Sequence, residues 1–252
     1  MIERPTFKPS FYVQVIEPEG ALLLSERGHV ALPGLVYARL ASLLDGRRTA
    51  DEIVDLLADA VSAPEVYFAL GQLEAKGYIT AAADGSVPPE RAAFWATLDL
   101  DAAEVGSRMA AATVAVERFG DVCAEPLLEA LASLGVRTGE PADVTVAVTE
   151  DYLHAGLADL NDAALAAGRP WLLVKPIGTV LWLGPFFQPG GGACWECMAQ
   201  RMRANREVQA FIRRRGGEGA PAATFPATLP ATVQTAAQLA AVEVAKLLAG
   251  AA

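Results

Sequence analysis

The chain has 252 residues, a hydrophobic fraction of 53% and a formal net charge of −10. The length suits one large domain or two ordinary ones, and the hydrophobic fraction excludes a chain that is disordered throughout. The negative charge argues against nucleic-acid partners and anionic membrane surfaces, because both attract basic proteins.

No apolar run is long enough to cross a membrane. The strongest candidate, residues 171–187, is interrupted by Lys175 and Pro176, and the N-terminus lacks the apolar core of a signal peptide. Three cysteines are too few for a secreted disulfide scaffold of this size. We therefore expect a cytoplasmic protein that does not associate with a membrane.

The first strands are predicted from β-branched and aromatic residues. Residues 11–18 (FYVQVIEP) form the first strand, and residues 21–26 and 29–34 are separated by a turn that predicts a hairpin. A helix is predicted over residues 35–46, with Gly46 as its end.

Two capping boxes mark the next helices. Thr49 with Glu52 and Ser62 with Glu65 are each a hydroxyl residue followed three positions later by glutamate, and Gly77 follows the second helix. The second helix is expected over residues 63–76. A small sheet with three short helices is typical of an α+β winged helix-turn-helix domain, which we place over residues 1–80.

The net charge of this winged helix distinguishes between two functions, DNA binding and peptide binding. Residues 1–90 hold seven Lys or Arg against thirteen Asp or Glu, so DNA phosphates would be repelled. An extended peptide could instead add a strand to the sheet edge and use Tyr67, Phe68, Leu70 and Leu73 as groove walls. Helical periodicity equally allows Phe68, Leu70 and Leu73 to be core residues, so both interpretations stay open.

Residues 81–93 contain small residues and prolines without periodicity, and we interpret them as a linker. Residues 94–252 then alternate between strand and helix patterns, which predicts an α/β Rossmann-like domain. The expected strands are 113–120, 143–150, 170–176 and 179–187, and the expected helices are 124–135, 157–168, 197–215 and 231–250.

The turn after the first of these strands does not suit a nucleotide. A dinucleotide or ATP site needs several glycines there, so that the backbone can approach phosphates at a helix N-terminus. Residues 118–125 (RFGDVCAE) have the single glycine Gly120, followed by the acidic Asp121. We expect no ATP.

The chain resembles a known family in two stretches. Residues 4–79 (RPTFKPSFYVQVIEPEGALLLSERGHVALPG…LDGRRTADEIVDLL…VYFALGQLEAKGYI) are similar to the leader-peptide-recognition winged helix of thiazole/oxazole-modified microcin cyclodehydratases. The segments VTEDYL, LLVKPIGTVLWLGPFF and CWECMAQRMRANR are similar to the ocin-ThiF-like domain that follows it. The resemblance implies that residues 94–252 are a degenerate ThiF-like domain.

The resemblance also implies a function. Proteins of this kind bind the leader of a ribosomally made precursor peptide and present the peptide to a YcaO cyclodehydratase, which forms azolines; the chain itself would be a non-catalytic recognition component and a homodimer. The implied leader-binding residues lie on the third strand and on the last winged-helix helix: His29, Val30, Ala31, Leu32, Val66, Tyr67, Leu70 and Leu73. Two alternatives are an ATP-dependent adenylating enzyme of the ThiF type and a winged-helix transcription regulator.

Cys194 and Cys197 have the spacing C-x-x-C. In ThiF-like relatives such a pair is half of a tetrahedral zinc site, and a second pair completes it. The chain stops at Ala252 without a second pair, which we interpret as a truncated or naturally short version. Three alternatives remain: a half-site without partners, zinc completed by another chain or copy, and free thiols that are redox-active or packed.

A basic run follows these cysteines. It comprises Arg201, Arg203, Arg206, Arg213, Arg214 and Arg215. The run could contact an acidic partner. Alternatively, it is a solvated helix face whose arginines pair with acidic neighbours, and we favour this second interpretation.

Overall fold

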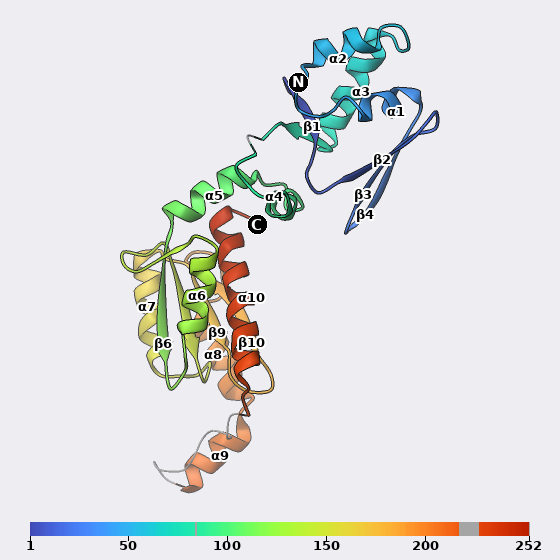
Figure 1. Ribbon diagram of the computed structural model, residues 1–252. Coiled ribbons are helices and arrows are strands. Elements are labelled where there is room, and N and C mark those ends of the chain that lie inside the picture. The colour runs from blue at the N-terminus through green and yellow to red at the C-terminus, as the bar shows by residue number, and fades with distance from the viewer. Residues whose placement is uncertain (84, 217–226, 252) are drawn as a thin grey trace. The chain divides into compact units, whose positions relative to one another are not determined.

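The computed structural model describes residues 1–83, 85–216 and 227–251. The chain divides into two compact units, Met1–Val105 and Gly106–Ala252 (Figure 1). Among the described residues, no helix combines the length and the apolar character needed to cross a membrane.

The first unit contains a winged helix. Its strands and helices are β1 (Pro5–Phe7), β2 (Tyr12–Ile16), β3 (Gly20–Ser25), β4 (Gly28–Pro33), α1 (Leu35–Ala41), α2 (Ala50–Leu57), α3 (Ala63–Ala75), β5 (Ile79–Ala81) and α4 (Pro89–Ala96). Strands β2, β3 and β4 form an antiparallel sheet in that order, while β1 pairs with β5. Helix α5 (Ala102–Ala111) spans the division between the units.

The capping boxes begin the helices as predicted. The backbone N–H of Thr49 donates to the Glu52 carboxylate at 2.7 Å, and the Glu52 N–H donates back to the Thr49 hydroxyl at 3.2 Å. The Ser62 backbone donates to Glu65 at 3.1 Å in the same way. Each box satisfies N–H groups that have no partner within their own helix.

Three helical boundaries differ from the sequence-based expectation. Helix α1 ends at Ala41 rather than near Gly46, whose N–H donates to the carbonyl of Pro5 at 3.1 Å and so joins β1 instead. Helix α4 begins at Pro89, inside the stretch interpreted as a linker, because proline suits the first turn of a helix. The long helix expected over residues 197–215 is two helices.

The second unit is an α/β domain with a mostly parallel sheet. Its elements are β6 (Thr113–Phe119), α6 (Glu125–Ser133), β7 (Arg137–Thr138), β8 (Val144–Thr149), α7 (Gly156–Ala167), β9 (Trp171–Lys175), β10 (Trp182–Phe187), α8 (Trp195–Ala204), α9 (Glu207–Gly216) and α10 (Pro230–Ala249). The strand order is β10-β9-β8-β6-β7, and only β10 is antiparallel to its neighbour.

Helices cover both faces of this sheet. Helix α10 packs against α6, β9 and β10, while α7 packs against α8 (Figure 1). Strand β8 is buried along its whole length, as expected for a central parallel strand. Trp171 and Trp195 are the largest fully buried side chains, and both belong to the core cluster beneath α7 and α8.

Candidate functional site

Strand β4 has an open edge. It pairs with β3 alone, and the residues paired across the two strands run from Ser25–Gly28 to Gly20–Pro33. The two-residue turn makes Ser25–Gly28 a hydrogen-bonded pair, and such pairs alternate along an antiparallel ladder. His29 and Ala31 therefore direct their N–H and C=O groups away from β3, whereas Val30 and Leu32 bond to it.

The side chains on β4 alternate between exposed and at least partly buried positions with the same period of two residues. His29 and Ala31 are exposed, Val30 is half-buried against the winged-helix core, and Leu32 is buried within it. The four predicted strand residues thus divide into two that offer backbone groups to a peptide and two that anchor the strand.

The four predicted residues of α3 differ in how deeply they are buried. Val66, Leu70 and Leu73 are at most 1% exposed and belong to the winged-helix core. Tyr67 is half-buried, and its hydroxyl donates to Asp51 at 2.6 Å, an interaction that raises the Tyr67 pKa. Phe68, which the sequence could not separate from the core, is 68% exposed.

Among the eight predicted residues, Val30 and Tyr67 are the two that are half-buried. Both are partly buried hydrophobic side chains that pack on the same core cluster. Val66, Leu70 and Leu73 belong to that cluster and have almost no exposed area, so they are core residues rather than groove walls.

The cysteine pair lies at the start of α8. Cys194 is the N-cap, Cys197 is in the first turn, and their sulfur atoms are 3.9 Å apart. Hydrogen bonds from the Cys197 backbone are the main cause of a lowered Cys194 pKa, and burial opposes them.

The sulfur separation fits two ligands of one zinc ion. Zinc–sulfur bonds of about 2.3 Å at a tetrahedral angle place two sulfurs about 3.8 Å apart. Within residues 1–83, 85–216 and 227–251, no group of three His, Cys, Asp or Glu side chains could hold a metal. Cys194 and Cys197 would therefore supply two of four ligands, and the remaining two would have to come from elsewhere.

The turn after β6 holds an acidic side chain where a nucleotide phosphate would approach. The Glu150 carboxylate follows β8 and accepts a hydrogen bond from the Asp121 N–H at 3.4 Å. A Cβ atom on Gly120 would lie 2.5 Å from the Glu150 side chain, so glycine is required for this close approach. A phosphate here would lie beside two carboxylates, and the absence of ATP binding stays a prediction.

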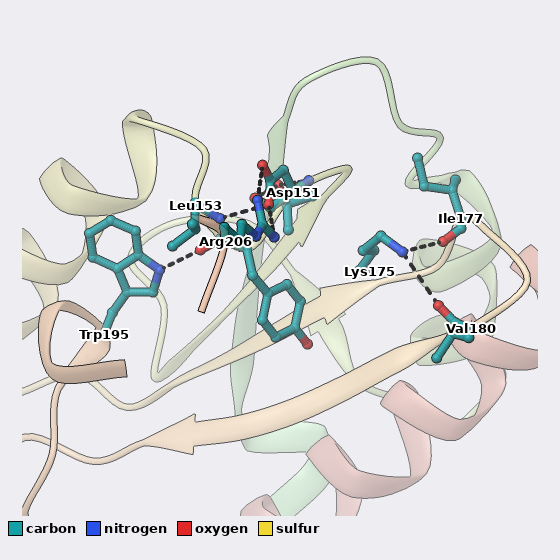
Figure 2. Close-up of polar contacts among 9 residues, drawn as sticks. Asp151, Leu153, Lys175, Ile177, Val180, Trp195 and Arg206 are labelled. Atoms are coloured by element: carbon teal, nitrogen blue, oxygen red, sulfur yellow. Dashed lines mark hydrogen bonds and ion pairs between the residues drawn. The ribbon is translucent and has the colours of Figure 1, made fainter. Parts of the chain in front are cut away.

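An ion pair joins the end of β8 to the helix break between α8 and α9. Arg206 donates to both oxygens of Asp151, at 2.9 and 2.8 Å (Figure 2). Burial raises the Asp151 pKa, but hydrogen bonds from Arg206 and the Leu153 N–H outweigh it, so the net pKa is lowered. Arg206 lies between the two helices, at the point where the predicted single helix is interrupted.

One other arginine of the basic run, Arg203, is also paired with an acidic residue. Arg203 donates to Glu196 at 2.6 Å and lies over the ring of Trp195. The Arg213 side chain falls outside the described residues. Arg203 thus fits the interpretation of a solvated helix face that pairs with acidic neighbours, whereas Arg206 pairs with Asp151 but is half-buried and lies outside the helices.

Sequence reasoning missed Asp151, Arg206 and Tyr152 as organising residues. The Tyr152 hydroxyl is 2.9 Å from the Leu173 carbonyl and 2.6 Å from that of Gly184, and the Tyr152 carbonyl accepts from the Trp195 indole at 2.9 Å. These contacts tie β9, β10 and α8 together. No local spacing in the sequence signals pairs that are separated by 21 to 55 residues.

The comparisons with known proteins agree with this architecture. A family model described as a winged helix-turn-helix domain matches residues 6–81. The comparison with curated proteins returned no match.

Two solved heterocyclases are similar to almost the whole chain. The heterocyclase TruD is 39% identical with a TM-score of 0.86, covering 98% of this chain and 36% of TruD. A heterocyclase in complex with substrate and cofactor is 37% identical with a TM-score of 0.83, covering 98% of this chain and 33% of that one. The chain therefore spans about a third of the length of these heterocyclases.

A more distant likeness concerns the fold alone. E. coli MccB, solved with MccA, is 12% identical with a TM-score of 0.68, covering 98% of this chain and 90% of MccB. Both units of the chain thus occur together in two groups of solved proteins.

Proposed function

We propose that the chain binds the leader of a ribosomally made precursor peptide and presents the peptide to a YcaO-type cyclodehydratase, without catalysing azoline formation itself. The observation that carries this proposal is the 39% identity to the heterocyclase TruD over 98% of the chain. A similar heterocyclase was solved with its substrate, which makes peptide handling the natural function to test.

The open β4 edge supports the peptide-binding part. His29 and Ala31 offer unpaired backbone groups to an added strand, and Val30 and Tyr67 offer half-buried apolar surface. Strand addition uses these two components: backbone hydrogen bonds supply affinity, and side-chain pockets supply selectivity.

Charge supports a peptide rather than DNA as the partner. Residues 1–90 carry a net charge of −6, from seven basic and thirteen acidic residues. Helix α3, which would enter the major groove of DNA, has Glu65 and Glu74 along its length and no basic residue.

The test is binding of a fluorescein-labelled leader, taken from the precursor encoded beside this chain, measured by polarisation with the full chain. Ala31→Pro removes an outward N–H at an edge position, where proline is tolerated. We expect saturable binding to the unsubstituted chain and affinity at least about tenfold weaker for Ala31→Pro.

Val15→Pro is the matched control. The alternation that directs Ala31 outward on β4 directs Val15 outward on β2, at the opposite edge of the same sheet. It should bind the leader as the unsubstituted chain does. Equal weakening by both prolines would argue against the β4 edge, and absence of any binding would reject leader recognition.

A further inference from the structure

The outer face of the sheet formed by β2, β3 and β4 is apolar. The register of the three strands places Val13, Leu23 and Val30 side by side on the face that packs against the winged-helix core. The alternate residues therefore lie on the opposite, outer face. They are Tyr12, Gln14, Ile16, Gly20, Leu22, Leu24, His29, Ala31 and Pro33.

This composition is unusual for a sheet face that meets water. An antiparallel sheet with one buried face usually carries polar and charged residues on the other face. Here Tyr12, Ile16 and Leu24 are exposed, and Leu22 is half-buried. None of the outer-face positions holds Asp, Glu, Lys or Arg, although residues 1–90 contain seven basic and thirteen acidic residues. The outer face is thus suited to contact with uncharged side chains.

A peptide strand added to β4 would continue this face. Residues that pair across neighbouring strands direct their side chains to the same side of the sheet. The peptide residues opposite His29 and Ala31 would therefore face outward, whereas the residue opposite Val30 would face the core side. The bound peptide would contact the winged helix on both sides of the sheet.

The small side chain of Ala31 leaves room for the peptide to reach β3. Gln14, Leu22 and Ala31 form one row across the outer face. An added strand would lie about 10 Å from β3, twice the spacing of neighbouring strands. Because Ala31 has only a methyl group, a long apolar side chain opposite it could lie over β4 and contact Leu22.

We propose that Leu22 and Ala31 select leader peptides that carry a long apolar side chain opposite Ala31, on the outer face of the sheet. This inference rests on the proposed function, because it requires the leader to pair with β4. Contact with Leu22 removes apolar surface of the leader from water. A charged side chain in the same place loses hydration and gains no charged partner on this face. The bound segment of the leader would have apolar residues at adjacent positions, one for each face.

The first test measures polarisation of the fluorescein-labelled leader with the full chain. Leu22→Gln keeps a side chain of similar length but makes it polar, and we expect affinity about fivefold weaker. Ile16→Gln is the matched control, since it makes the same change on the outer face of β2, two strands away from the peptide. It should bind the leader as the unsubstituted chain does, and circular dichroism checks the fold of both variants.

The second test leaves the protein unchanged. Each residue of the leader is replaced in turn by aspartate, and we expect adjacent positions, one for each face, to lose about tenfold in affinity. For a leader whose outward residue is replaced by alanine, Leu22→Gln should weaken binding no further, because the two side chains act as one contact.

The outcomes separate this inference from leader binding itself. Saturable binding that Leu22→Gln leaves unchanged, equal weakening by the two glutamine variants, or sensitive leader positions that only alternate with tolerant ones would overturn selection by the outer face. Each of these results would leave leader recognition standing. Absence of any binding to the unsubstituted chain would reject leader recognition and this inference with it.

Discussion

Arg206 binds Asp151 through two parallel hydrogen bonds at the point where α8 gives way to α9. The pair is partly exposed, with 26% of the Arg206 and 43% of the Asp151 side chain accessible. Its interaction with solvent limits the free energy it contributes, in spite of its good geometry.

Arg206→Ala should lower the free energy of unfolding by about 1 kcal/mol at neutral pH, the upper end for exposed pairs. Arg203→Ala is the control, because its pair with Glu196 is more exposed, at 46% and 56%. Urea unfolding followed by circular dichroism measures both. An Arg203→Ala effect as large as that of Arg206→Ala would contradict a special role for the Asp151 pair.

The stabilisation that the Asp151–Arg206 pair provides should decrease as the pH falls. The Asp151 pKa is lowered from 3.8 in the folded protein, so its stabilisation is present above 3.8 and is lost as pH falls through the lower, folded pKa. The difference in unfolding free energy between the unsubstituted chain and Arg206→Ala should therefore shrink on going from neutral pH to about pH 3. A difference that is constant or grows on acidification would reject this linkage.

Leu70→Ala and Phe68→Ala should differ in their loss of unfolding free energy, because Leu70 is a core residue of α3 and Phe68 is a surface residue. Leu70 is 1% exposed, so its truncation leaves a cavity and should cost about 2–5 kcal/mol of unfolding free energy. Phe68 is 68% exposed, and its truncation should change stability by less than about 0.5 kcal/mol. Thermal and urea unfolding of the full chain distinguish the two, and a large loss in Phe68→Ala would show that it packs against something in solution.

Tyr152→Phe should destabilise the second unit. The substitution keeps the ring but leaves the Leu173 and Gly184 carbonyls without the hydroxyl proton, at a cost of about 1–2 kcal/mol. Tyr12→Phe provides the control, because Tyr12 is 67% exposed and should tolerate the change. Equal unfolding midpoints for Tyr152→Phe and the unsubstituted chain would mean that water replaces the hydroxyl.

The acidic turn after β6 predicts that the chain does not bind ATP. The carboxylates of Asp121 and Glu150 would lie beside the phosphates, and the Asp121 N–H is already used by Glu150. Calorimetric titration with Mg-ATP should give no saturable heat, with E. coli MccB, which was solved with ATP, as the positive control. Saturable binding together with pyrophosphate exchange would favour the adenylating alternative instead.

Local sequence signals predicted the local structure well. The capping boxes at Thr49 and Ser62 begin α2 and α3, and the turn before Gly28 joins β3 to β4. The α/β alternation after residue 113 correctly predicted a mostly parallel sheet, because α6 follows β6 and α7 follows β8 along the chain.

Features that depend on distant partners could not be predicted in this way. Val66, Leu70 and Leu73 have the helical spacing of a groove wall, but the same spacing serves the core, and only packing shows that they are buried. The ion pair at the break between α8 and α9 involves Asp151, which lies 55 residues before Arg206. The direction of each β4 backbone group follows from register, which the hydrophobic pattern alone leaves open.

The edge of β4 has few outward-directed backbone groups, which limits the selectivity that backbone hydrogen bonds can give to peptide binding. Between the turn and Pro33, which has no N–H, only His29 and Ala31 present both a donor and an acceptor outward. A handful of backbone hydrogen bonds at about 0.5–1.5 kcal/mol each contributes only a few kcal/mol, much of which the ordering of a free peptide consumes. Almost any extended sequence could make those bonds, so under the proposed function discrimination between leader peptides would have to come from their side-chain contacts with the winged helix.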